Sequence, residues 1–246
     1  MGMYLISLST STNTGGASIV SDIVNCTRGF EIAVTYGVPQ APLDGPGGAI
    51  SFWPGAYVGA ANNYCWLFQP LLMQGETTNG WSAAPAAWIQ EPSGPTAAQL
   101  GWADSTVKQG NLFVPKPGDR VKSYISYDKA TGNWIQGMQD MTSGQSFACQ
   151  FTAGQTYRNV YPCPDNSKFY IIYFTIECAF QPTAANIWRG EIDALATFTV
   201  DSRAHKQDFT NTANWTPEVY SGVGGLRLEE PDLDRFKMVL PPIPAE

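Results

Sequence analysis

The chain has 246 residues, of which 14% are charged and 13% aromatic, and its formal net charge is −7. An acidic chain is a poor partner for nucleic acid or an anionic membrane, so we expect neither. No apolar run reaches the ~18 residues of a transmembrane helix. The one histidine, His205, lies in a polar stretch; we therefore expect no Ser–His triad, no metal site and no cofactor.

The N-terminal half predicts a series of short strands rather than helices. Residues 8–18 are polar and are expected to be flexible. Pro70 would remove a hydrogen-bond donor from a central strand, so its strand is expected at a sheet edge or at a bulge. Strands are predicted at 30–36, 49–53, 56–59, 64–75 and 81–91, with loops at 39–48 and 92–101.

The middle of the chain predicts a meander of two hairpins. Residues 120–127 alternate apolar and polar side chains, which is typical of a strand with one buried face. The segment 128–132 contains the turn signal Thr131-Gly132, and 133–140 returns as the next strand. A second turn at 142–145 leads to a third strand at 146–151.

The clearest strand is 169–177, in which almost every residue is β-branched or aromatic. Side chains alternate across a strand, so its even-numbered residues are predicted to face the core and Tyr173, Thr175 and Glu177 the other face. A last strand is predicted at 193–200. We interpret 1–200 as one β-sandwich domain and 201–246 as an extension packed on the same domain, with one strand at 236–240.

Five cysteines leave the redox compartment open. Cys26 could pair with Cys65 and Cys149 with Cys163, which would leave Cys178 as a buried thiol. Two sequons, at Asn25 and Asn214, and the cysteine usage are compatible with the secretory pathway. The N-terminal residues lack the basic region of a signal peptide, so a cytoplasmic location stays open as well.

About twelve strands, frequent turns and no repeat predict an all-β protein: a two-sheet antiparallel sandwich of the jelly-roll kind. The order of elements resembles the concanavalin A-like sandwich of the fungal glutamic peptidases (eqolisins). The matching stretches are 57–60, 67–69, 81–88, 114–121, 142–146, 174–177 and 193–199. The resemblance implies a catalytic pair of Gln69, with Gln74 as the alternative, and Glu177. It also implies an acid endopeptidase activity.

A second resemblance is to the hetero-Diels–Alderases of fungal tropolonic sesquiterpene pathways, and it is carried by size, aromatic richness and few charges. It implies a cofactor-independent biosynthetic enzyme that holds apolar or aromatic small molecules in the concave face. Such an enzyme lowers the barrier by orienting the reacting molecules rather than by supplying a metal or a strong nucleophile. Gln69 and Glu177 would be the catalytic residues. Substrate-binding residues would be Trp53, Trp88, Lys122, Tyr124, Tyr173 and Thr175.

A third interpretation is a lectin-like module that stacks sugars on exposed indoles without catalysis. Most tryptophans, among them Trp66, Trp134 and Trp188, are expected in the core instead. We favour the small-molecule enzyme, with the peptidase and the glycan-binding module as alternatives. The sequence does not determine the substrate or the oligomeric state.

Overall fold

The computed structural model describes residues 14–21, 29–40, 49–60, 63–74, 80–91, 97–128, 130–160, 169–179, 190–200, 215–219, 227–232 and 235–240. Side-chain positions are described within 29–40, 51–56, 65–74, 80–91, 97–128 and 130–160. Within these ranges, no helix has the length and hydropathy to cross a membrane. The predictions for Cys26, Cys163, Cys178, Trp188 and His205 therefore concern side chains outside the described set.

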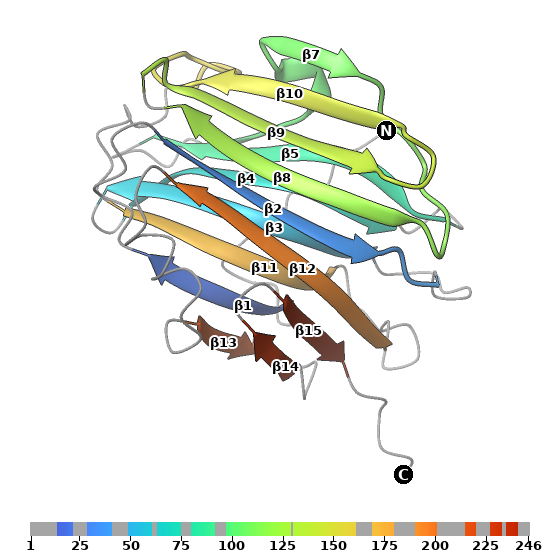
Figure 1. The fold of residues 1–246 in the computed structure, drawn as a ribbon. Helices are drawn as coiled ribbons and strands as arrows, with labels where there is room; N and C mark the ends of the chain where they lie inside the picture. Colours follow the sequence, from blue (N-terminus) through green and yellow to red (C-terminus); the bar gives the residue numbers. More distant parts are fainter. Residues whose placement is uncertain are drawn as a thin grey trace.

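The strands form two antiparallel sheets that lie one over the other (Figure 1), which confirms the predicted all-β sandwich. The first sheet has seven strands, in the order β13 (Trp215–Val219), β1 (Thr14–Ser21), β11 (Phe169–Ala179), β3 (Ala49–Ala60), β4 (Asn63–Gln74), β5 (Ser82–Gln90) and β6 (Ala97–Leu100). The second has eight, in the order β14 (Arg227–Asp232), β15 (Arg235–Leu240), β12 (Gly190–Val200), β2 (Gly29–Gly37), β8 (Arg120–Asp128), β9 (Asn133–Asp140), β10 (Ser146–Thr152) and β7 (Val107–Gly110). A short 3-10 turn covers Trp102–Asp104.

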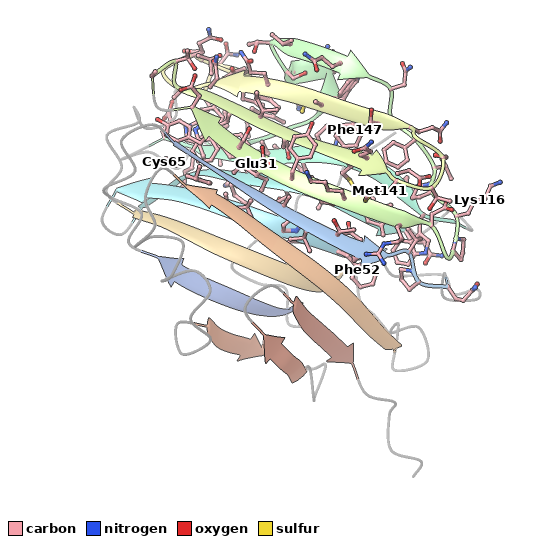
Figure 2. All side chains as sticks on the ribbon, viewed as in Figure 1. Glu31, Phe52, Cys65, Lys116, Met141 and Phe147 are labelled. Carbon is pink, nitrogen blue, oxygen red and sulfur yellow. The ribbon has the colours of Figure 1, made fainter. Side chains whose placement is uncertain are left out.

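The space between the sheets is filled by aromatic rings. Phe68 of β4 stacks on Trp134 of β9, with ring centroids 4.6 Å apart, and Trp134 stacks on Tyr127 of β8 at 4.4 Å. Trp66 extends the stack on the other side of Phe68, at 5.3 Å. Trp66 and Trp134 are thus core residues, as predicted. Figure 2 shows Phe147 among the side chains that crowd β8, β9 and β10, and Lys116 pointing away from the sheets.

Several predicted boundaries are corrected by the structure. Residues expected to be flexible within 8–18 contribute to β1, and the expected loop 92–101 contains β6. Both segments have weak strand propensity, but each pairs with a neighbouring strand along its length, and such pairing overrides propensity. The two short strands expected at 49–53 and 56–59 form one strand, β3, with a register shift between Val58 and Gly59.

Pro70 lies at the centre of a sheet, not at an edge or a bulge as the sequence predicted. It pairs with Pro85 of β5, and the β3–β4 register on both sides of it sets Pro54 opposite. Three buried prolines therefore occupy one level of three neighbouring strands. A proline removes a donor but keeps its carbonyl, so this position leaves carbonyls rather than N–H groups without a ladder partner, and an under-satisfied carbonyl is the less rare of the two in folded proteins. We call this level the proline row.

The predicted disulfide between Cys149 and Cys163 is wrong. Cys149 is a free, buried thiol on the core side of β10. Cys65 is disulfide-bonded. Because Cys149 is free, the partner of Cys65 is one of the cysteines whose side chains are outside the described set. The expected Cys26–Cys65 pair stays a prediction.

Asp140, at the end of β9, should make stability depend on pH. Its carboxylate accepts hydrogen bonds from the Thr142 and Ser143 backbone N–H groups and from Ser143 Oγ, at 2.8, 3.1 and 2.6 Å. Burial raises the pKa of Asp140, but the hydrogen bonds from Ser143 and Thr142 outweigh burial and hold that pKa below its usual value. Because the folded pKa is below the unfolded value of ~3.9, the ionised carboxylate stabilises the fold above that pH. This stability is lost as pH falls through the folded pKa.

Asp140→Asn should therefore lower the free energy of unfolding by about 1–3 kcal/mol at pH 7, and by progressively less below pH ~4. Urea unfolding of both proteins across this range measures the difference. Lys116→Gln, at an exposed position, serves as the control. Parallel stability curves for the wild type and Asp140→Asn would contradict this assignment.

Candidate functional site

The outer face of the seven-stranded sheet carries a second, smaller group of buried side chains. On β4 the even-numbered Trp66, Phe68 and Leu72 belong to the core between the sheets. Cys65, beside the register shift, also belongs to the core. From Leu67 on, the odd-numbered side chains therefore lie on the opposite face of the sheet. There they form a separate cluster with neighbours from β3 and β5. Its buried members are Trp53, Leu67, Leu71 and Ala86, with Met73 and Trp88 packed against them. We call this group the outer cluster.

Gln69 lies within this outer cluster and is only 3% exposed. Its Nε2 is buried and has no hydrogen-bond partner in the described part of the chain. Leaving a buried donor unpaired costs about 1–3 kcal/mol, so such a group calls for a physical reason. Trp66 Nε1 is likewise unpaired, but it lies in the core. Gln69 combines an unpaired donor with a position outside the inter-sheet core.

Trp53 lies over a glycine beside Gln69. A Cβ added to Gly55 would meet Cζ3 of Trp53 at 2.5 Å and Cδ1 of Leu67 at 3.4 Å, so the indole occupies the space above Gly55. The β3–β4 register sets Gly55 opposite Gln69, and Ala86 of β5 pairs with Gln69 on its other side. Small residues thus flank the amide on both neighbouring strands. The large described side chains around it, such as Trp53 and Leu67, are apolar.

The register also places the predicted residues of β11, of which only the backbone is described. Tyr173 pairs with Gly55, Thr175 with Trp53 and Glu177 with Ser51. All three positions therefore belong to the outer face that carries Gln69. Tyr173 is on the same level as Gln69, two strands away. Glu177 is also two strands away but four residues further along, which corresponds to a Cα separation of about 16 Å.

Lys122 and Tyr124 do not join this group. They lie on β8, in the other sheet, with a parity opposite to the buried Val121, Ser123 and Ile125. Their side chains therefore occupy the outer face of the eight-stranded sheet. Tyr124 lies over Gly137, and Lys122 Nζ is 5.8 Å from the Tyr124 ring centroid. A single groove containing Gln69, Lys122 and Tyr124 is thus corrected to positions on opposite sides of the sandwich.

Of the two candidate amides, Gln69 is the one on the outer face. Gln74 pairs with Ile50 and has the parity of the core-facing residues of β4. Trp88 pairs with Leu67 and packs against the outer cluster, partly exposed. The structure thus brings together Gln69, Trp53 and Trp88, with Glu177, Tyr173 and Thr175 on the same face.

The other reactive groups of the described residues are poorly suited to catalysis. Burial raises the pKa of the Cys149 thiol to about 12, although nearby Lys108 acts in the opposite direction, so the thiol is protonated at neutral pH. Burial raises the pKa of Tyr124, and Glu31 raises it further. No group of three His, Cys, Asp or Glu side chains that could hold a metal ion occurs in the described ranges.

Sequence reasoning missed Gln136, which lies behind the outer cluster. It is fully buried on the core face of β9, and its Nε2 donates a hydrogen bond to the carbonyl of Ala86, 3.0 Å away in the other sheet. The sequence contained a signal for it, because Gln136 lies on the same face of its strand as Trp134 and Met138, which are core residues. A glutamine at such a position is unusual.

No protein-family model matches the sequence, and no curated protein sequence matches it. Among solved structures, the fold is similar to scytalido-glutamic peptidase bound to a transition-state analogue inhibitor. The TM-score is 0.54 and the identity 12%, over 93% of this chain and 98% of that one. Tailspike protein 2 of an Escherichia coli O157:H7 bacteriophage gives a TM-score of 0.37 at 12% identity, over 72% and 20% of the two chains. That second similarity is too weak to support an inference.

At 12% identity the first similarity shows the fold alone. The predicted resemblance to the glutamic peptidase sandwich is confirmed at that level. Nothing among the comparisons supports the resemblance to hetero-Diels–Alderases.

Gly55→Ala tests whether Trp53 depends on the glycine beneath it. The new methyl group would overlap the indole, so Trp53 should move. We expect a shifted tryptophan emission maximum and a loss of about 1–3 kcal/mol in the free energy of unfolding. Gly37→Ala is the matched control, because an added Cβ there meets no atom within 4 Å. An unchanged spectrum in Gly55→Ala would contradict the described position of Trp53.

Proposed function

We propose that this protein is a cofactor-independent enzyme that binds a flat, poorly charged organic compound on the outer face of the seven-stranded sheet. The Gln69 amide would donate a hydrogen bond to an oxygen of that compound. The proposal depends on one observation: a buried, unpaired Nε2 within an apolar cluster. A ligand oxygen would supply the missing acceptor, and Trp53 and Trp88 would supply apolar contact area.

The surroundings of Gln69 favour an oxygen that gains charge during a reaction. Hydrogen bonds are electrostatically stronger where water is excluded, and Gln69 is 3% exposed. A fixed donor in such a place stabilises a developing oxyanion or enolate more than a neutral carbonyl. This preference fits a quinone-methide-like substrate, whose carbonyl oxygen gains negative charge and becomes the aryl ether oxygen of the new ring when the compound reacts as a heterodiene.

A cycloaddition of such a diene with an alkene requires orientation rather than a strong nucleophile. Holding two partners face to face can contribute ~7–11 kcal/mol to lowering the barrier. Glu177, on the same face as Gln69, would act in the preceding step by transferring a proton as water leaves the precursor. The proton transfer and the cycloaddition are separate steps, so Glu177 and Gln69 need not contact the same substrate atom. A Cα separation of about 16 Å is compatible with both steps.

A glutamic endopeptidase is the second candidate, because the fold is similar to scytalido-glutamic peptidase. Peptide hydrolysis by such a pair requires that the amide and the carboxyl both lie within hydrogen-bond distance of the attacking water or the scissile carbonyl. The four-residue offset between Gln69 and Glu177 weighs against such a pair. The glycan-binding alternative has no observation in its favour, and Trp66 and Trp134 are core residues rather than exposed platforms.

Binding of a neutral naphthyl ketone, 6-propionyl-2-dimethylaminonaphthalene, tests the donor role of Gln69. The wild type should bind it with a change in emission that reports an apolar, hydrogen-bonded carbonyl. Gln69→Ala should weaken binding about three- to tenfold, the value of one hydrogen bond. Gln139→Ala, on the exposed side of β9, is the control. Absence of binding to the wild type, or equal affinity of Gln69→Ala, would refute the proposal.

The same variants test the reaction. An ortho-quinone methide generated in solution adds to an electron-rich alkene to give a chroman, with no atom lost, and the uncatalysed product is racemic. The wild type should give an enantiomeric excess that Gln69→Ala reduces. A racemic product with a protein that binds the ketone would remove the cycloaddition and leave the binding proposal standing.

Acid proteolysis separates the second candidate from the first. A glutamic peptidase should cleave a denatured protein at pH 2–4, where a glutamic acid of usual pKa ~4.3 is largely protonated, and Glu177→Gln should abolish the cleavage. Under our proposal the wild type gives no cleavage between pH 2 and pH 7. Cleavage that disappears in Glu177→Gln would establish the peptidase and overturn the cycloaddition enzyme.

A further inference from the structure

The carbonyl of Ala86 receives a hydrogen bond from the opposite sheet, directly behind Gln69. Gln136 Nε2 donates this bond across the core over 3.0 Å. Ala86 is in turn the cross-strand neighbour of Gln69 and a member of the outer cluster. One side chain of the eight-stranded sheet is thereby tied to the strand that forms one side of the Gln69 site.

Packing alone does not explain a glutamine at position 136. The residue is 0% exposed, and its Oε1 has no partner in the described part of the chain. Burying an amide with one unpaired oxygen costs free energy that an apolar side chain of similar size would not cost. Met138, two residues further along the same face of β9, shows that this strand accepts such a side chain in the core.

The proline row provides a structural reason for the hydrogen bond between Gln136 and the Ala86 carbonyl. Pro70 and Pro85 are the residues next to Gln69 and Ala86, and neither has an N–H for the ladder between β4 and β5. The strands beside the site are therefore held by fewer backbone donors than an ordinary sheet. An additional bond to Ala86 compensates at the level where a donor must be held within about 0.5 Å of its working position.

We propose that Gln136 is a positioning residue for the Gln69 site: it holds the Ala86 carbonyl and so fixes β5 against the Gln69 amide. The inference rests on the proposed function, since it names the support of that same donor. Gln136 does not touch the substrate. Its loss should change the position and mobility of Gln69 more than it changes the stability of the fold.

Gln136→Met is the test, with Met138→Leu as the matched control on the same strand and face. The melting temperature of Gln136→Met should stay within a few degrees of the wild type or rise, because the unpaired Oε1 is removed along with the bond. The side-chain amide signals of Gln69, assigned in a ¹H–¹⁵N spectrum by their absence in Gln69→Ala, should shift and broaden. Affinity for the naphthyl ketone should fall at least about fivefold. Met138→Leu should change neither the signals nor the affinity.

Unchanged Gln69 signals in Gln136→Met overturn the positioning role. A large fall in melting temperature with unchanged ketone affinity also overturns it, because Gln136 would then be purely structural. If Gln136→Met does not fold, Gln136→Leu replaces it, and failure of both variants to fold likewise assigns a structural role. If the wild type does not bind the ketone, the proposed function fails, whereas the ligand-free amide spectrum still decides the positioning role.

Discussion

An aromatic stack at the centre of the core joins the two sheets, and the position of the candidate site depends on it. Trp66 and Phe68 come from β4, Trp134 from β9 and Tyr127 from β8, and the successive ring planes are within about 11–22° of parallel. Within this stack the Phe68–Trp134 contact crosses between the sheets, so it constrains their separation and lateral position at this point. Because side chains alternate along β4, fixing Phe68 toward the core also fixes Gln69 on the outer face. The candidate site and the core therefore lie on opposite faces of the same strand.

The strands were predictable where local pattern and tertiary pairing agree. The meander of β8, β9 and β10 has alternating side chains and turn signals, and each strand appears close to its expected residues. Phe169–Ala179 likewise forms a strand, and Ile172 and Phe174 pair with the buried Ala56 and Pro54. By contrast, Thr14–Ser21 has a weak strand pattern with two adjacent glycines, and its pairing with β11 along its whole length makes it a strand. That partner is more than 140 residues away in sequence, and no local pattern reports it.

The candidate site was predictable in part for the same reason. Strand parity put Gln69 and the residues of β11 on corresponding faces, because parity is a local property. Parity alone does not say to which sheet a strand belongs, and for that reason Lys122 and Tyr124 were grouped with Gln69 although they lie on the other sheet. Gln136 could not be linked to the site from sequence at all. Its contact with Ala86 runs between sheets, over 50 residues of chain, and becomes visible only when both sheets are in place.

The strands within residues 215–240 determine which edges the two sheets present. β13 pairs with β1 in the seven-stranded sheet, and β15 pairs with β12 in the eight-stranded sheet. Without these strands, β1 and β12 would be the last strands on that side of their sheets, with unpaired backbone groups along one edge. Such edges are templates for association with other chains. Residues 215–240 cover the edges of β1 and β12, and β13 and β14 take their place as the last strands on that side of the two sheets. Both are shorter than the strands they replace at the edge, so the folded protein offers a shorter template for association.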